Sequence, residues 1–410
     1  MTAAGGFTRF LRHGWPVALL TAGLASLAAC GGGYNAPRSG GGGGQPNNLQ
    51  AVQVNLGPAG NDVDTLLASV TVCLPGTSTC QIIQDVNVDT GSEGLRILAS
   101  QTGLHLPQEK DASGNPLGNC ITFADNSYIW GPVVVADVQI AGEQAASVPV
   151  QIIGDPNFAT VPAACNTGGA ADDTVTALGA NAILGVGVFR QDCGAACAGN
   201  AAQAPNVYFS CPNSGCSIAA VPLQNQLQNP VWLFPQDNNG LLLSLPSVPA
   251  TGSSSVSGSL IFGVGTQSNN GLGSVQVYTT DAQGNFTTTF NGTPYSSSFI
   301  DSGSSGFFFL DSATTGMPAC TGGNSGFYCP ASTMNFSATN TGANGASAAV
   351  SFTIANAMSL FQSGNSAYSN LGGPNSGTFD WGLAFFFGRQ VFVGIENQNS
   401  PAGPGPYWAY

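Results

Sequence analysis

Two short motifs in the chain each place an aspartate in front of a small, hydroxyl-rich turn. Asp89 opens the sequence Asp-Thr-Gly-Ser and Asp301 opens Asp-Ser-Gly-Ser, and each follows an apolar residue. If the two turns meet, their carboxyl groups cannot both ionise at low cost, so the pair would hold a single shared proton. Such a pair can activate a water, with one Asp as general base and the other as general acid toward a substrate carbonyl. The motifs therefore predict hydrolysis that needs no metal, cofactor or covalent intermediate.

The residues that follow each aspartate suit a close approach of the two turns. A glycine at the second position carries no side chain, so the backbone can turn sharply and another loop can come near. The hydroxyl directly after each Asp can bond to the opposing loop, and the serine at the third position can orient the carboxylate. The expected supporting residues are Thr90, Gly91, Ser92, Ser302, Gly303 and Ser304.

The chain has few of the residues that other catalytic mechanisms need. It holds two histidines, and His13 lies in a segment that we expect to be removed, which leaves His105. One histidine without a fitting motif argues against Ser-His-Asp or Cys-His catalysis. Lys110 is the only lysine, so Ser-Lys chemistry is equally unsupported. The cysteines contain no Cys-x-x-Cys pair, which argues against a zinc site.

The composition indicates the class of protein. Charged residues make up 7% of the 410 residues, and the formal net charge is −13. The scarcity of Lys and Arg excludes a general nucleic-acid binder, because phosphate binding needs clustered positive charge. The apolar fraction of 43% is ample for a core, and Gly and Pro divide it into runs of strand length. We therefore expect an all-β protein with long loops.

Six apolar runs are the strongest strand candidates, and two segments are weak helix candidates. The expected strands are 67–72, 81–88, 131–140, 148–153, 259–264 and 391–395. The expected helices are 93–102 and 355–362.

An internal repeat organises these elements. The two Asp motifs lie 212 residues apart, and each is followed later by an apolar element that ends in glycine, 182–185 and 379–382. This repetition predicts two related lobes that each contribute one acidic loop. We place the N-terminal lobe at 51–266 and the C-terminal lobe at 267–410.

The first 50 residues have the composition of an export signal and a tether. Residues 1–29 combine arginines with an apolar run too short to span a bilayer. The run ends Leu-Ala-Ala-Cys, which resembles a bacterial lipobox and makes Cys30 the expected lipidation site. Residues 30–50 are rich in Gly, Pro and Asn and predict a flexible tether. A lipoprotein with glycine after that cysteine is expected at the outer membrane, on the periplasmic face or the cell surface. An ordinary secretory signal with a chance cysteine is the alternative.

The ten remaining cysteines form an even set, which in an exported protein indicates disulfides. Close spacing suggests four pairs and leaves one distant pair, although spacing alone does not fix the connectivity. The candidate pairs are Cys73–Cys80, Cys120–Cys165, Cys193–Cys197, Cys211–Cys216 and Cys320–Cys329.

The two Asp motifs, their separation and the segment 181–187 together resemble the pepsin-like aspartic peptidases. Segment 259–263 resembles the strand that closes the first lobe of that family, and 388–394 resembles its C-terminal strands. The resemblance covers most of the chain and implies a bilobal, pepsin-like fold. It also implies that Asp89 and Asp301 form the catalytic dyad.

The same resemblance assigns three residues to the flap and substrate cleft, and each departs from the family pattern. The stretch 123–131 resembles the family's flap, a hairpin over the cleft, and in it Phe123 takes the place of the flap tyrosine and lacks its hydroxyl. Arg96 stands where a tryptophan often supports that tyrosine. Glu93 occupies a position that is normally small or polar, and it brings a third carboxylate near the dyad. These changes bear on flap function and substrate preference, whereas both Asp motifs are intact.

The sequence therefore predicts a monomeric aspartic endopeptidase that acts on an extended peptide or protein and is held to a membrane by its N-terminal lipid. One alternative keeps the fold without the activity, as a peptide- or protein-binding lipoprotein. Another is a disulfide-stapled structural protein in which the Asp motifs are turns. The structural alternative fails if the carboxyl groups of Asp89 and Asp301 lie within hydrogen-bond reach.

Overall fold

A computed structural model describes residues 47–123, 125–166 and 168–410. The expected signal at 1–29, the lipidation site Cys30 and most of the expected tether lie outside the described residues, as does Ala124 of the expected flap. Within the described ranges, none of the helices has the length and apolar character needed to cross a lipid bilayer.

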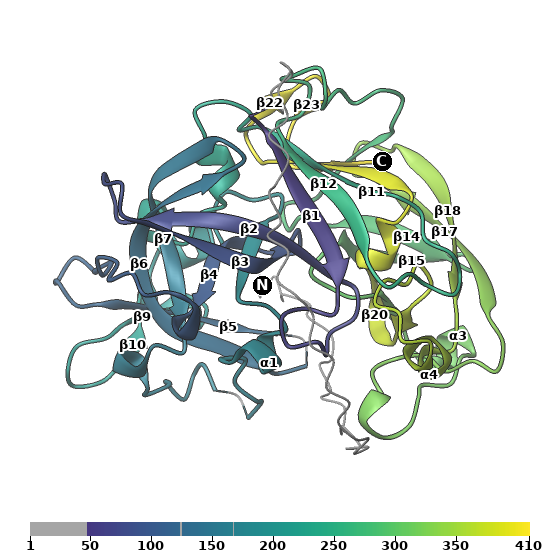
Figure 1. The fold of residues 1–410 in the computed structure, drawn as a ribbon, viewed down its shortest axis with the longest axis horizontal. Coiled ribbons are helices and arrows are strands. Elements are labelled where there is room, and N and C mark those ends of the chain that lie inside the picture. Colours follow the sequence, from purple (N-terminus) through teal and green to yellow (C-terminus); the bar gives the residue numbers. More distant parts are fainter. Residues whose placement is uncertain (1–46, 124, 167) are drawn as a thin grey trace, which may run out of the picture.

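The chain forms two β-rich lobes, which Figure 1 shows in purple and blue on one side and in green and yellow on the other. The strands of the first half are β1 (Leu49–Asn55), β2 (Thr65–Cys73), β3 (Cys80–Asp89), β4 (Glu93–Leu98), β5 (Leu117–Thr122), β6 (Tyr128–Ile140), β7 (Glu143–Ile153), β8 (Ala182–Val186), β9 (Tyr208–Ser210), β10 (Ser217–Ile218), β11 (Gly240–Leu245) and β12 (Val256–Phe262). Those of the second half are β13 (Val277–Thr279), β14 (Phe286–Phe290), β15 (Thr293–Ile300), β16 (Phe307–Leu310), β17 (Met334–Thr341), β18 (Ser347–Ile354), β19 (Gly372–Gly373), β20 (Asn375–Trp381), β21 (Arg389–Gly394), β22 (Asn399–Ser400), β23 (Gly403–Pro404) and β24 (Tyr407–Ala409).

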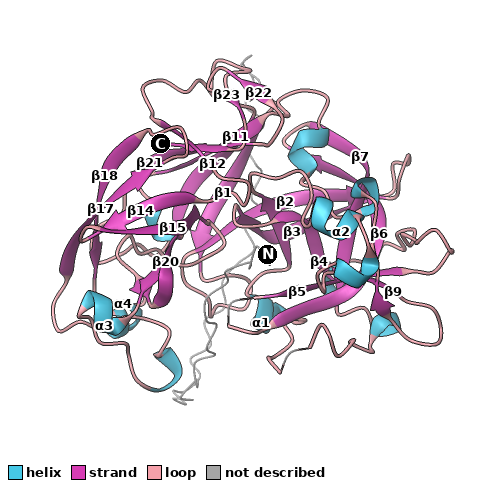
Figure 2. Ribbon diagram, turned by 180° about the vertical axis from the view of Figure 1, so that it is seen from behind, coloured by secondary structure: helices cyan, strands magenta, loops and turns pink. Residues whose placement is uncertain are grey.

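The α-helices are short and lie beside the sheets rather than between them (Figure 2). They are α1 (Val175–Leu178), α2 (Ala195–Ala198), α3 (Ser312–Thr315) and α4 (Ala357–Gln362). The all-β, two-lobed architecture expected from the sequence is therefore confirmed.

The internal repeat appears as one strand arrangement built twice. In the first lobe β3 pairs in parallel with β8, and β4 pairs antiparallel with β8 on its other side. In the second lobe β15 pairs in parallel with β20, and β16 pairs antiparallel with β20. Each Asp motif is the turn between the outer two strands of its group. The repeat thus places both acidic turns at equivalent positions of the two lobes.

A set of strands that we call the joining sheet connects the lobes, in the order β1, β12, β11, β21, β24, β13. β12 pairs with β1 from the start of the described chain, and β11 pairs with β21 from its last part. Figure 1 shows β1 and β12 running between the two lobes. Pairing therefore crosses the boundary that we place between residues 266 and 267, and that boundary stays a prediction.

All six expected strands are present, and α4 confirms the helix expected at 355–362. The helix expected at 93–102 is wrong, because this segment is strand β4 followed by a single 3₁₀ turn at Ala99–Gln101. Every residue of β4 is buried, and the strand lies between β7 and β8. A strand covered on both faces shows no alternation of apolar and polar residues, so its pattern resembles that of a buried helix.

Each of the five expected cysteine pairs forms a disulfide. Four of them close loops of 4 to 9 residues, and Cys120–Cys165 ties together positions 45 residues apart. Cys120 lies on β5 and Cys165 follows β7, so this bridge secures the hairpin region of the N-terminal lobe.

Candidate active site

The two Asp turns meet between the lobes. Asp89 is the last residue of β3, and Asp301 follows β15 directly. Their side chains are hydrogen-bonded to one another, and the residues are 6% and 2% exposed. The alternative in which the motifs are merely structural turns predicted that these carboxyl groups would lie apart, and the structure contradicts it.

Reciprocal hydrogen bonds hold the two turns together. The Thr90 N–H donates to Ser302 Oγ at 3.1 Å, and the Ser302 N–H donates to Thr90 Oγ1 at 2.9 Å. Each hydroxyl then donates to a carbonyl of the opposite turn, Ser302 to Val88 at 2.7 Å and Thr90 to Ile300 at 3.3 Å. All four bonds are buried, so separating the turns would leave several polar groups without partners. This arrangement fixes the distance between the carboxyl groups.

Glycine is required at both turns because each faces the carboxyl group of the other. A Cβ atom on Gly91 would lie 2.5 Å from Cγ of Asp301, and one on Gly303 would lie 2.7 Å from Cγ of Asp89. The glycine amides also hold the acids, since Gly91 N–H donates to Asp89 Oδ1 at 2.8 Å and Gly303 N–H donates to Asp301 Oδ1 at 2.7 Å.

The serine at the third position of each motif binds the outer carboxylate oxygen. Ser92 Oγ lies 2.6 Å from Asp89 Oδ2, and Ser304 Oγ lies 2.8 Å from Asp301 Oδ2. Burial, followed by the neighbouring Asp89, raises the pKa of Asp301 well above its usual range. The pair can therefore keep one proton where an isolated carboxyl group would have lost it, which provides an acid and a base side by side.

Two further carboxyl groups lie close enough to act on the dyad electrostatically. Glu93 is buried at the start of β4 and accepts a hydrogen bond from the Phe189 N–H at 3.1 Å. Burial raises the pKa of Glu93, and nearby acids including Asp89 raise it further. The expectation of a third carboxylate near the dyad thus agrees with its position.

The other carboxyl group belongs to Asp380, which was not among the expected site residues. It lies on β20, is 1% exposed, and contacts Ser304 Oγ through Oδ2 at 2.7 Å. The signal for it was present in the repeat: Asp380 interrupts an apolar element at the position that Ile183 occupies in the first copy. An acid inside a buried strand next to one of the Asp motifs is a candidate site residue in its own right.

The guanidinium of Arg96 is buried inside the N-terminal lobe, where polar side chains bind it. It pairs with Asp192 at 3.0 Å and donates to Asn119 Oδ1 at 2.7 Å and Gln151 Oε1 at 3.1 Å. Tyr208 O–H donates to the other oxygen of Asp192 at 2.6 Å. Arg96 is 1% exposed, which leaves no surface for a substrate and favours a structural role over the expected place in the cleft.

Replacing Arg96 with methionine is expected to lower the free energy of unfolding by about 3–5 kcal/mol at neutral pH, because Asp192 would remain buried without its cation. Urea unfolding measures this loss. Adding Asp192→Asn should recover much of it, since the uncompensated charge is then removed. A loss below about 1 kcal/mol, as for solvated surface pairs, would contradict the buried pairing.

Phe123 is buried directly after β5, where its N–H donates to the Ser127 carbonyl at 2.8 Å across the hairpin turn. It belongs to a hydrophobic cluster that also contains Leu98, Ile129 and Ile183. The aromatic ring is therefore packed within the N-terminal lobe, and its contact with substrate stays a prediction.

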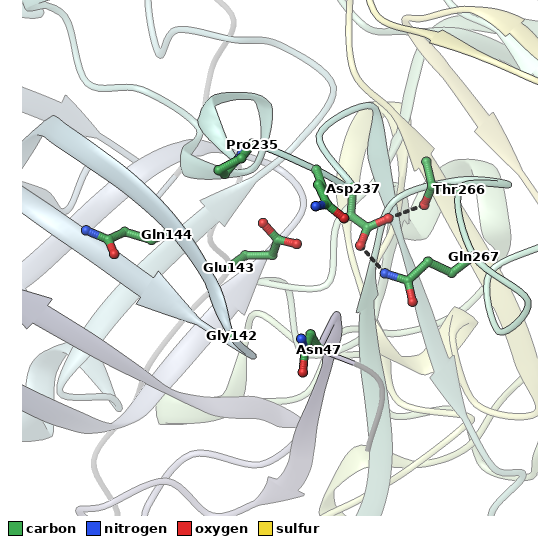
Figure 3. A pocket seen from close by; sticks show the side chains of 9 residues that line it. Asn47, Gly142, Glu143, Gln144, Pro235, Asp237, Thr266 and Gln267 are labelled. Carbon is green, nitrogen blue, oxygen red and sulfur yellow. Dashed lines mark hydrogen bonds between the residues drawn. The ribbon is translucent and has the colours of Figure 1, made fainter. Parts of the chain in front are cut away.

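A separate polar cavity of about 700 Å³ contains none of the expected site residues. It is lined by Asn47, Gly142, Glu143, Gln144, Pro235, Gln236, Asp237, Thr266 and Gln267 (Figure 3). The side chain of Asp237 is taken up by hydrogen bonds from Thr266 and Gln267. In the described part of the chain, no three His, Cys, Asp or Glu residues gather as metal ligands would.

The fold and site define a two-lobed β protein in which each lobe contributes one Asp turn to a shared, buried carboxyl pair. The chain belongs to the family described as "Protein of unknown function (DUF3443)", whose model matches residues 44–410. Among solved structures, the aspartic proteinase from Irpex lacteus is 15% identical, with a TM-score of 0.45 over 88% of this chain and 96% of that one. No curated protein matches the chain.

Proposed function

We propose that this protein is an aspartic endopeptidase in which Asp89 and Asp301 activate a water for attack on a peptide bond. The observation that carries the proposal is the hydrogen-bonded carboxyl pair held by two interlocked turns. Apposing two buried carboxyl groups is unfavourable for folding. A fold that keeps this arrangement, with serine, threonine and glycine at each supporting position, is suited to chemistry that needs a shared proton.

The roles of the two acids follow from their environments. Asp301 holds the proton, because burial and the adjacent Asp89 raise its pKa, and it donates to the carbonyl oxygen of the substrate. Asp89 accepts a proton from the attacking water, and the glycine amides and serine hydroxyls keep both carboxyl groups oriented. Asp89 then gives that proton to the amide nitrogen as the C–N bond breaks, and Asp301 takes a proton back from the hydroxyl of the tetrahedral intermediate, which leaves an amine and a carboxylic acid. The attacking group is water, so no covalent bond forms between substrate and protein. Activity should be highest at acidic pH and fall as Asp301 loses its proton.

The second candidate function is peptide or protein binding by a catalytically weak member of the same fold. The burial of Phe123 within its hydrophobic cluster favours it, because the lid over the substrate then lacks both the usual hydroxyl and a free ring. Binding of a peptide without turnover would identify this function.

The test is cleavage of an unfolded, disulfide-free protein from acidic to neutral pH by the wild type and by Asp89→Asn and Asp301→Asn. We expect cleavage at acidic pH by the wild type and loss of cleavage in each variant, because a neutral amide cannot exchange the shared proton. Asp311→Asn is the matched control, since Asp311 is a partly exposed acid in the same lobe and away from the Asp turns, and it should cleave like the wild type. A wild type that is inert while all variants fold would favour the binding function.

We also propose that the protein is exported and held at the outer membrane by a lipid on Cys30, and that it works as a monomer on peptide or protein substrates. The five disulfides support an oxidising compartment. Metabolic labelling with palmitate, compared between the wild type and Cys30→Ser, tests the anchor.

A further inference from the structure

The hydroxyl of Ser304 lies between two carboxyl groups. Its Oγ atom is 2.8 Å from Oδ2 of Asp301 and 2.7 Å from Oδ2 of Asp380. Both distances are those of hydrogen bonds to a hydroxyl. The equivalent serine of the first lobe, Ser92, has an aspartate on one side, and the residue corresponding to Asp380 there is Ile183. At this position the second lobe therefore carries an acid where the first lobe has an aliphatic residue.

A serine hydroxyl has one hydrogen and can donate to only one of these two oxygens. The other carboxyl group must donate to Ser304 instead, so it must be protonated on the oxygen that faces the serine. The proton of Asp301 is engaged with Asp89, because those two carboxyl groups are hydrogen-bonded to each other. The proton that faces Ser304 therefore belongs to Asp380.

The surroundings of Asp380 require the same protonation. In the register of the strands it is opposite Phe299 of β15 and Phe308 of β16. Its second oxygen, Oδ1, is buried and has no hydrogen-bond partner in the described structure. An ionised carboxylate with one oxygen unpaired in such a site would be far less stable than the neutral acid, whose carbonyl oxygen tolerates the lack of a donor better.

We propose that Asp380 is a positioning residue of the site: it carries a proton of its own and donates it in a hydrogen bond to Ser304, which fixes the Ser304 hydroxyl as a donor to Asp301. This inference rests on the proposed function for its catalytic meaning. Burial raises the pKa of Asp380 well above its usual range, and Asp301 and Asp89 raise it further, while the hydrogen bond with Ser304 lowers it and does not offset them. These two acids are the charged groups of the described structure that act on it.

Ionisation of Asp380 would reverse the chain of hydrogen bonds. Ser304 would turn its hydrogen toward the new carboxylate, and Asp301 would lose the donor on its outer oxygen. The working state of the three carboxyl groups therefore holds two protons, and it can be lost by ionisation of either the dyad or Asp380. Replacing Asp380 with asparagine removes the group that ionises, and the amide can still donate a hydrogen bond to Ser304. The active protonation state should then persist to higher pH.

The first experiment measures the proton on Asp380 without reference to catalysis. Urea unfolding of the full chain is followed from acidic to neutral pH for the wild type, Asp380→Asn and Asp311→Asn. Above the pKa of an unfolded Asp, the folded wild type holds a proton that the unfolded chain has released, so its stability falls with pH. We expect this slope to decrease by about one proton in Asp380→Asn. Asp311, whose pKa is lowered by the Thr314 N–H, should show no such decrease.

An unchanged slope in Asp380→Asn would overturn the proposal, because Asp380 would then be ionised in the folded state. Should the asparagine variant fail to fold, Asp380→Ile provides the same test, since isoleucine is the residue found at the equivalent position of the first lobe. It removes the carboxyl group and is expected to show the same loss of one proton from the slope.

The second experiment tests the positioning role through the pH profile of kcat/KM, with each variant scaled to its own maximum. We expect the alkaline limb of Asp380→Asn to move to higher pH than that of the wild type. The shift should vanish when both proteins also carry Ser304→Ala, which removes the hydroxyl that links the two acids. An alkaline limb that stays in place in Asp380→Asn would overturn the positioning role. A protein inert at every pH would overturn the proposed function, while the unfolding slopes would still decide the protonation of Asp380.

Discussion

Substituting Gly91 with alanine is expected to abolish peptide cleavage and to lower the free energy of unfolding by about 1–3 kcal/mol, the usual range for an overpacked site. The added Cβ atom would lie 2.5 Å from Cγ of Asp301 and 2.7 and 2.9 Å from its two oxygens. Asp301 cannot move aside cheaply, because the Gly303 amide and Ser304 hold its carboxyl group. The two turns must therefore separate, and the shared proton is lost with their contact.

Cleavage rates and urea unfolding, measured on the same preparations, check this expectation. Gly271→Ala is the matched control, because a Cβ atom there meets nothing within 4 Å. It should leave both quantities close to those of the wild type. Wild-type cleavage by Gly91→Ala would show that the close approach of the two turns is not needed for the reaction.

The stability of the protein is expected to be greatest at acidic pH and to decline toward neutral pH, which is the reverse of ordinary acid denaturation. Burial, as the largest cause, raises the pKa values of Asp64, Glu93, Asp301 and Asp380 well above their usual range. Between the unfolded pKa, about 4, and each folded pKa, the native state holds protons that the unfolded chain has released. Stability is then present below the unfolded pKa and is lost as pH rises through the folded pKa.

The expected slope is about 1.4 kcal/mol per pH unit for each extra proton in the folded state. Asp111 and Asp311, whose pKa values are lowered, act in the opposite direction, but both are partly exposed and their contributions are screened. Urea unfolding with the disulfides intact, repeated across the acidic to neutral range, measures the slope. A stability that rises with pH over this range would contradict the protonated, buried carboxyl groups.

The sequence indicated six of the longer strands, the candidate cysteine pairs and the meeting of the two Asp turns. The strands of the core have runs of apolar residues bounded by turn residues, and most cysteines have a neighbour within ten positions. The Asp turns could be paired because two copies of one rare motif indicate a repeated unit. Their catalytic role stays a prediction that rests on the proposed experiments.

Features that depend on register or on several distant segments could not be predicted. Asp380 faces Ser304 because of the pairing of β20 with β15 and β16, and a shift of one residue would turn it to the other face. Arg96 is buried because residues from four other segments complete its hydrogen bonds and ion pair. The local sequence around Asp380 and Arg96 contains none of these partners, so it does not indicate that either side chain is buried and hydrogen-bonded.

The joining sheet also limits the order in which the strands of a newly synthesised chain can pair. β11 is flanked by β12 and β21, and β21 in turn by β24, so the middle of this sheet is closed only after residue 394 has been synthesised. Until then β11 presents an open strand edge, which is a template for pairing with another chain. Contacts of such long sequence separation also form slowly. The joining sheet is therefore completed only together with the second lobe, and a chain that stalls before β21 exposes an edge from which aggregation can start.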